Sequence, residues 1–119
     1  LGINKPLKNL QHHNLFFDED FGKHASEIYE NPAWPSNPLF YVCCTSKSDT
    51  TVAPTNHENV FILIPVAPDL RDTEDVREKY FTSIIDRLEK LTGQSIKENI
   101  VYKKLESLVI GADLASKII

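Results

Sequence analysis

Four short segments of the chain are rich in β-branched and aromatic side chains, the composition typical of β-strands. They cover residues 14–17, 39–45, 59–67 and 100–104. Every position of 60–66 in the third segment is apolar, so we expect both faces of that strand to be covered. Pro65 cannot donate a hydrogen bond to a neighbouring strand, so the end of this strand is expected at a sheet edge, at a bulge or past the pairing.

A first helix is predicted directly after residues 14–17. Asp18 is expected as its N-cap, with Glu19 and Asp20 in the first turn, where carboxylates favour the helix dipole. The helix should end at Asn31, because a proline disfavours the helical conformation of the residue before it. The apolar side chains at helical spacing, which predict its buried face, are Phe21, Ala25 and Ile28.

A second and longer helix is predicted over residues 73–91. Asp72 or Thr73 is expected to cap its start, and Gly93 suits the left-handed residue that ends a helix. Its apolar stripe, at spacings of four and three, consists of Val76, Tyr80, Ile84, Leu88 and Leu91. This face must pack on the sheet.

The order of these elements, strand, helix, strand, strand, helix, strand, predicts an α+β fold with a small mixed, mainly antiparallel sheet packed against two helices. Residues 46–58 are polar and long enough to join the second and third strands as an antiparallel pair. The tail, residues 105–119, is ambiguous: 108–110 could form a strand and 112–119 a helix. A chain of 119 residues, 41% of them hydrophobic, supports one core and one domain.

The formal net charge is −4 and no basic stripe is present, which argues against a nucleic-acid partner. No apolar run reaches the roughly 20 residues of a membrane span, and no signal segment is evident, so we expect a cytoplasmic chain without an anchor. Cys43 and Cys44 are neighbours on a predicted strand and should point to opposite faces. We expect both to be reduced, structural thiols.

The histidines are the first candidates for chemistry. His12, His13, His24 and His57 could be imagined as metal ligands together with the carboxylates of residues 18–20. However, His12 and His13 are adjacent and would diverge on a strand, and no pair has the i, i+4 spacing of a zinc-binding helix. The sequence therefore predicts surface or strand-end histidines and no metal site.

Two other chemical signals are weak. No Gly-x-Ser-x-Gly turn or flanked cysteine marks a catalytic nucleophile. Residues 109–116 resemble a dinucleotide-binding turn, but Asp113 and Ser116 occupy the positions that need glycine, so ordinary packing is expected there. The aromatic residues of the predicted strands could line a passage for an apolar ligand, although such residues belong to a core more often. They are Phe16, Phe17, Phe40, Tyr41 and Phe61.

Five collinear blocks of the chain resemble the bacterial phytoene desaturase (phytoene dehydrogenase) family of carotenoid biosynthesis. They cover residues 11–17, 37–43, 49–54, 58–66 and 92–96. The resemblance extends over residues 1–104 in one register, which makes it more specific than a single motif. It implies an FAD-dependent oxidoreductase that removes hydrogen from phytoene or a related precursor and so introduces conjugated double bonds. Residues 1–104 would be an internal, substrate-side domain fragment of that enzyme, and 105–119 a divergent tail.

The resemblance also defines what this piece is expected to lack. The glycines, Gly2, Gly22, Gly93 and Gly111, cannot supply the FAD fingerprint, so FAD is expected in the intact enzyme, whereas this piece should bind no cofactor and be inactive. The implied partners are an apolar carotenoid and the remaining domains of the enzyme, with peripheral membrane contact of the intact protein. No catalytic, cofactor-binding or metal-binding residue is assigned. The alternative is a small stand-alone α+β binding module that could self-associate through uncovered apolar surface.

Overall fold

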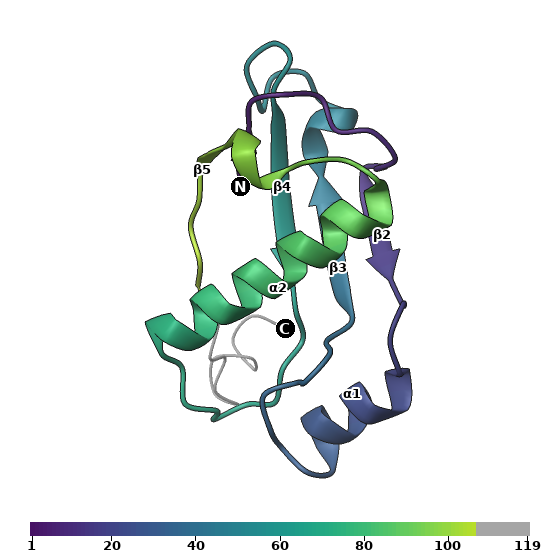
Figure 1. Cartoon of the computed structure of the whole chain (residues 1–119), viewed down its shortest axis with the longest axis vertical. Helices are drawn as coiled ribbons and strands as arrows, with labels where there is room; N and C mark the ends of the chain where they lie inside the picture. Colours follow the sequence, from purple (N-terminus) through teal and green to yellow (C-terminus); the bar gives the residue numbers. More distant parts are fainter. Residues whose placement is uncertain (107–119) are drawn as a thin grey trace, which may run out of the picture.

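The computed structural model describes residues 1–106, which form one sheet and two α-helices (Figure 1). The elements are β1 (Gly2–Ile3), β2 (His13–Phe16), α1 (Phe21–Tyr29), β3 (Phe40–Cys44), β4 (Glu58–Leu63), α2 (Glu74–Thr92) and β5 (Ile100–Tyr102). Short 3-10 turns, Thr45–Lys47 and Lys97–Asn99, follow β3 and precede β5. The tail elements predicted over 108–110 and 112–119 lie outside the described residues.

The sheet has the strand order β2-β3-β4-β1-β5, and each of its pairings is antiparallel. The predicted α+β fold, with a mainly antiparallel sheet and two helices, is confirmed. β1 was not predicted, because two residues carry no readable pattern. A side chain at Gly2 would bring its Cβ within 3.2 Å of the Cβ of Tyr102, so glycine lets β1 fit against β5.

α2 crosses one face of the sheet, which we call the inner face (Figure 1). Its predicted ends are confirmed: the Thr73 hydroxyl accepts a hydrogen bond from the Val76 amide at 3.2 Å, and Gly93 has a φ of 69°. Ile84 and Leu88 of the predicted stripe are buried. The prediction is wrong for Leu91, which is 43% exposed, because the helix turns Thr92 rather than Leu91 inward.

α1 lies beyond the ends of β2 and β3 instead of on a sheet face (Figure 1). The predicted N-cap is wrong by two residues: Asp20 caps the helix, accepting from the Gly22 amide at 2.9 Å. Asp18 instead pairs with Arg87 of α2 at 2.6 Å. Phe21, predicted to be buried, is 65% exposed, because the helix turns His24 toward the core.

The core lies between α2 and the inner face. Residues of β3 and β4 alternate, so that Val42 and Val60 are buried while Phe61 is 55% and Leu63 46% exposed. The expectation that both faces of residues 59–67 are covered is therefore wrong, because α2 covers one face and nothing among residues 1–106 covers the other. The buried cluster consists of Ile3, Leu7, Leu10, Phe40, Val42, Cys44, Val60, Ile84, Leu88 and Ile96.

Glu58, at the start of β4, ties three segments together beside this core. Its carboxylate accepts hydrogen bonds from the Leu7 amide at 3.1 Å and the Ser46 hydroxyl at 2.8 Å, and pairs with the Lys47 ammonium at 2.6 Å. Burial alone would raise the pKa of Glu58, but the bonds from Lys47, Leu7 and Ser46 outweigh it and hold that pKa below its ordinary value. A buried carboxylate is tolerated here because each of its oxygens has a partner.

Candidate functional site

The side of the sheet turned away from α2 carries apolar side chains from three neighbouring strands. The register places Leu15, Tyr41 and Leu63 in one cross-strand row, and His13, Cys43 and Phe61 in the next. We call these six residues the exposed sheet face. Leu15 is 65% exposed, and a contiguous set of exposed apolar side chains on adjacent strands marks a contact surface.

The structure divides the five aromatic residues that could line an apolar passage. Phe16 and Phe40 stack at 4.8 Å between ring centroids on the inner side, as core residues. Tyr41 and Phe61 belong to the exposed sheet face, and Phe17, one residue past β2, is 61% exposed. The passage hypothesis therefore keeps three of the five.

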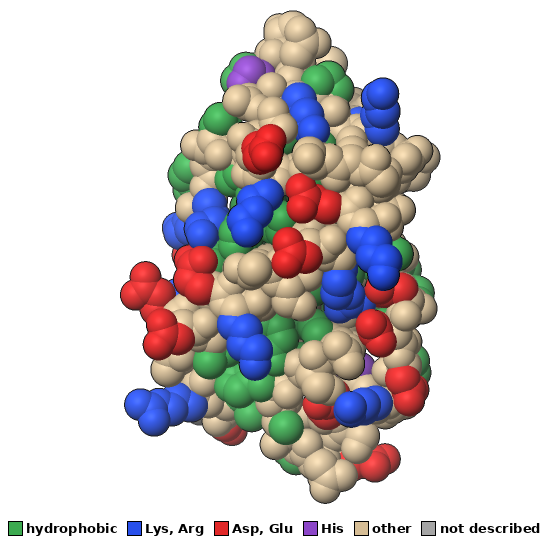
Figure 2. Space-filling model, in the orientation of Figure 1, with side chains coloured by type: hydrophobic (Ala, Val, Ile, Leu, Met, Phe, Trp, Pro, Cys, Tyr) green, Lys and Arg blue, Asp and Glu red, His purple; other side chains and the backbone are tan. Residues whose placement is uncertain are grey.

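An apolar groove of about 710 Å³ lies between α2 and the later part of β4. It opens there because β1 is short and pairs with β4 only at Asn59 and Glu58. Figure 2 shows hydrophobic side chains gathered below the mixed charges of α2. The apolar lining includes Ile62, Ile64, Val76, Phe81, Ile84 and Leu105.

Among residues 1–106, no helix has the length and apolar composition that crossing a membrane requires.

His12 and His13 do not diverge as predicted. Their rings stack, with centroids 4.3 Å apart, and one nitrogen of each ring lies within 4.8 Å of the other and of the Cys43 sulfur. His12 Nδ1 is 2.9 Å from the Ser48 hydroxyl, and His13 Nδ1 is 2.6 Å from the Tyr41 hydroxyl. The pKa of Tyr41 is raised above its ordinary value, and the neighbouring Cys43 side chain is the largest cause. Imidazole, thiol and phenol groups therefore meet at one end of the exposed sheet face.

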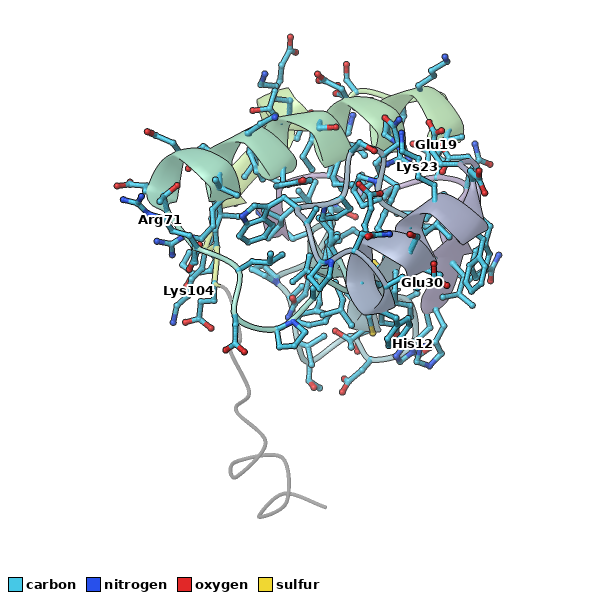
Figure 3. All side chains as sticks on the ribbon, turned by 90° about the horizontal axis from the view of Figure 1, so that it is seen from below. His12, Glu19, Lys23, Glu30, Arg71 and Lys104 are labelled. Atoms are coloured by element: carbon cyan, nitrogen blue, oxygen red, sulfur yellow. The ribbon has the colours of Figure 1, made fainter. Side chains whose placement is uncertain are left out.

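The other two histidines lie elsewhere. The buried His24 accepts a hydrogen bond from the Leu39 amide at Nδ1, 3.0 Å, and its Nε2 lies 2.8 Å from the Pro65 carbonyl, so it joins three segments. His57 contacts the Thr55 carbonyl within its own loop. Of the carboxylates weighed above as co-ligands, Glu19 is remote from the histidine pair: Figure 3 shows it beside α2 and His12 on the opposite side of the molecule.

The two cysteines point to opposite faces, as predicted. Cys44 is fully buried, and burial raises the pKa of its thiol, which suits a structural role. Cys43 is half-buried on the exposed sheet face and lies among polar groups. The sequence did not distinguish the two, because alternation shows that faces differ but does not show which face is covered.

The described residues do not fit the pyrophosphate of FAD. Such a site needs a glycine-rich turn between a strand and a helix N-terminus. α2 instead begins with Thr73 followed by Glu74 and Asp75, whose carboxylates would repel a pyrophosphate. Gly22 lies inside the first turn of α1, where the Asp20 carboxylate takes the free amides. The residues 109–116, weighed above as a nucleotide turn, are outside the described part.

Curated relatives match most of the chain. Carotenoid 3,4-desaturase of Haloarcula japonica is 36% identical over 104 residues, which is 87% of this chain and 21% of that protein. The 4,4'-diaponeurosporene oxygenase of Staphylococcus haemolyticus is 31% identical over 107 residues, 88% of this chain and 21% of that protein. The protein of the same name from Staphylococcus aureus is 31% identical over 105 residues, with 87% and 21% covered. No protein-family model matches. The chain spans about one fifth of the length of these relatives.

Proposed function

We infer the function from one premise: this chain belongs to the carotenoid desaturase family, of whose named relatives it spans 21%. We propose that it forms the substrate-side portion, residues 1–104, of an FAD-dependent oxidoreductase. The intact enzyme would introduce conjugated double bonds into phytoene or a related carotenoid precursor. It would work in the cytoplasm and meet its substrate at the membrane surface.

The observation that carries this proposal is the exposed sheet face. Leu15, Phe61 and Leu63 are each about half or more exposed, although they project from the same strands as the core. A long polyene is apolar along its length, and a wall of aliphatic and aromatic groups holds it without leaving polar atoms unpaired. We propose that the apolar part of this face, Leu15, Tyr41, Phe61 and Leu63, forms one wall of the substrate passage, and that the rest of the enzyme forms the other.

FAD, as electron acceptor, would be held by parts of the enzyme outside this chain. FAD would supply the redox chemistry as acceptor of the hydrogen removed from the carotenoid, and this chain would supply orientation and part of an apolar enclosure. The four apolar residues of that wall would position the polyene and exclude water. We therefore expect the isolated chain to be colourless and to gain no flavin absorbance after incubation with FAD and gel filtration. Stoichiometric yellow flavin eluting with the chain would contradict this.

A chimera tests the function directly. Residues 1–104 replace the matching segment of the Haloarcula japonica desaturase, and the chimera is expressed in a carotenoid-producing host. We expect desaturated product, detected as red-shifted pigment absorbance after chromatography. Phe61→Asp should reduce the yield of that product at least about tenfold, because a buried unpaired carboxylate in an apolar passage is costly. Tyr29→Asp, at a position 81% exposed on α1, is the matched control and should leave the yield unchanged.

The outcomes separate the possibilities. A chimera that folds, binds FAD and makes no product would contradict a shared substrate-side role. Equal yields from Phe61→Asp and Tyr29→Asp would keep the family relation but remove the exposed sheet face from the passage.

A further inference from the structure

We propose that His12, His13 and Cys43 form a binding site for one divalent transition-metal ion, Zn²⁺ being the ion that best fits the donor set. One nitrogen of each ring and the Cys43 sulfur all lie within 4.8 Å of one another. The proposal is independent of the desaturase function, because it rests on three side chains at one end of the exposed sheet face.

Strand pairing explains why two of these side chains meet. The Cys44 amide donates to the His12 carbonyl at 2.8 Å, which makes residues 12 and 44 a hydrogen-bonded pair. His13 and Cys43 are the next pair in the register and so lack direct backbone hydrogen bonds to each other. Side chains of such pairs approach most closely across an antiparallel ladder.

His12 joins the group because the backbone bends at this residue, directly before β2 begins at His13. Its carbonyl still accepts from the Cys44 amide, but at a bend the side chain does not follow the alternation of a regular strand. The His12 ring lies on the His13 ring with an interplanar angle of 26°. This placement overturns the reasoning from sequence, in which two adjacent histidines had to diverge.

The distances between the three donor atoms are close to those in a zinc site. Tetrahedral zinc, with Zn–N near 2.0–2.1 Å and Zn–S near 2.3 Å, requires donor atoms roughly 3.3–3.6 Å apart. Closing separations of at most 4.8 Å to that value takes about 1 Å of movement. His13 is exposed, while His12 and Cys43 are half-buried, so side-chain torsions can supply this movement without disturbing the core.

Neighbouring hydroxyls give the site its outer layer. Ser48 Oγ contacts His12 Nδ1, and the Tyr41 hydroxyl contacts His13 Nδ1. Because Nδ1 of each ring contacts a hydroxyl, Nε2 is the nitrogen that would face the ion. Partners of this kind fix the ring orientation in metal sites.

The donor chemistry selects the ion. Two imidazoles and a thiolate suit zinc and copper rather than calcium or magnesium, which prefer oxygen. The chain contains no methionine, so it cannot supply the axial methionine common in copper electron-transfer sites. Three protein ligands leave a fourth position for water or for a ligand from another part of the enzyme. The ammonium group of Lys47 forms an ion pair with Glu58 on the inner side of the sheet, so its charge does not repel a bound metal ion.

Cobalt substitution tests the site in the 119-residue chain under a non-thiol reductant. We expect one Co²⁺ per chain, with a near-ultraviolet sulfur-to-cobalt charge-transfer band and intense visible bands typical of a tetrahedral site, both removed by competing Zn²⁺. Cys43→Ser should abolish the charge-transfer band. His13→Ala should weaken Zn²⁺ binding at least about 100-fold, whereas Tyr41→Phe, which removes only an outer partner, should weaken it about tenfold.

His57→Ala is the matched control, because this histidine contacts its own loop at Thr55 and lies outside the cluster. It should leave Zn²⁺ affinity unchanged, and far-ultraviolet circular dichroism should show each variant folded. If Cys43→Ser does not fold, His12→Ala takes its place with the same expected loss of affinity as His13→Ala. A chain that binds Co²⁺ without a charge-transfer band, or that loses affinity equally in His57→Ala, would overturn the proposal.

Discussion

The two faces of the sheet are made from the same strands and similar residues, yet side chains are buried on one face and exposed on the other. On the inner face, Phe40 is 3% and Val60 2% exposed. On the outer face, one residue further along the same strands, Phe61 is 55% exposed. The difference lies in what covers each face, because α2 spans one and no element among residues 1–106 spans the other. An apolar strand face therefore indicates a contact surface. Only the fold shows whether the same chain provides the covering element.

The polar groups differ in the same way. Inside, the Glu58 carboxylate and the His24 ring have their hydrogen-bonding atoms engaged by other segments. Outside, one ring nitrogen of His13 and the Cys43 sulfur lie within 4.8 Å of each other near the surface. Polar groups within the core therefore hold distant segments together, whereas His13 on the exposed sheet face contacts Tyr41 of the neighbouring strand.

The largest expected effect on stability comes from a substitution in the core under the inner face. Leu88→Ala should lower the free energy of unfolding by about 3 kcal/mol, because Leu88 is 1% exposed and its truncation leaves a cavity under α2. Leu63→Ala removes the same groups from the exposed sheet face and should cost less than about 1 kcal/mol. Urea unfolding followed by circular dichroism measures both. Equal losses would show that the exposed sheet face is packed as tightly as the inner one.

The second prediction concerns the buried carboxylate. Glu58→Gln should destabilise the fold at pH 7 by about 2 kcal/mol, because it removes the charge that binds Lys47 and weakens the bonds from Leu7 and Ser46. The pKa of Glu58 is lowered in the folded chain, so its stabilising effect is fully present above the ordinary glutamate pKa of about 4.3. That effect is lost as the pH falls below this value through the folded pKa.

Urea midpoints at pH 7 and pH 3 check this dependence. The difference between wild type and Glu58→Gln should be large at pH 7 and should shrink at pH 3. Glu19→Gln, which changes an exposed carboxylate, should match wild type at pH 7. A difference that stays the same from pH 7 to pH 3 would mean that the glutamine disturbs packing rather than charge.

The sequence predicts the helices and strands better than it predicts the contacts between them. The spacing of apolar residues and the caps Thr73 and Gly93 place α2 correctly, because these signals are local. The start of α1 was misplaced because Asp18 and Asp20 are equally good caps, and the choice depends on Arg87, which is distant in sequence. The meeting of His12, His13 and Cys43 could not be foreseen either, since it depends on strand register and on where β2 begins.

A third and smaller loss of stability is expected from removing the N-cap of α2, the helix that covers the inner face. Thr73→Ala removes the hydroxyl that accepts from the Val76 amide and should cost about 1 kcal/mol. Amide hydrogen exchange should rise first in the opening turn of α2. Asp20→Ala removes the cap of α1 and should cost a similar amount, with faster exchange confined to α1. Faster exchange in α2 from the Asp20 change would contradict the separation of the two helices.

The smallest effect on stability is expected on the exposed sheet face, where the effect on association should be largest. Phe61→Ser should change the free energy of unfolding by no more than about 0.5 kcal/mol, because the ring is already largely in water. If the isolated chain self-associates, sedimentation should show that Phe61→Ser and Leu15→Ser shift it toward monomer, whereas Tyr29→Ser on α1 does not. Loss of stability without a change in association would assign these side chains to the fold. Loss of association at unchanged stability would identify the exposed sheet face as a surface made to be covered by another part of the enzyme or by a second copy.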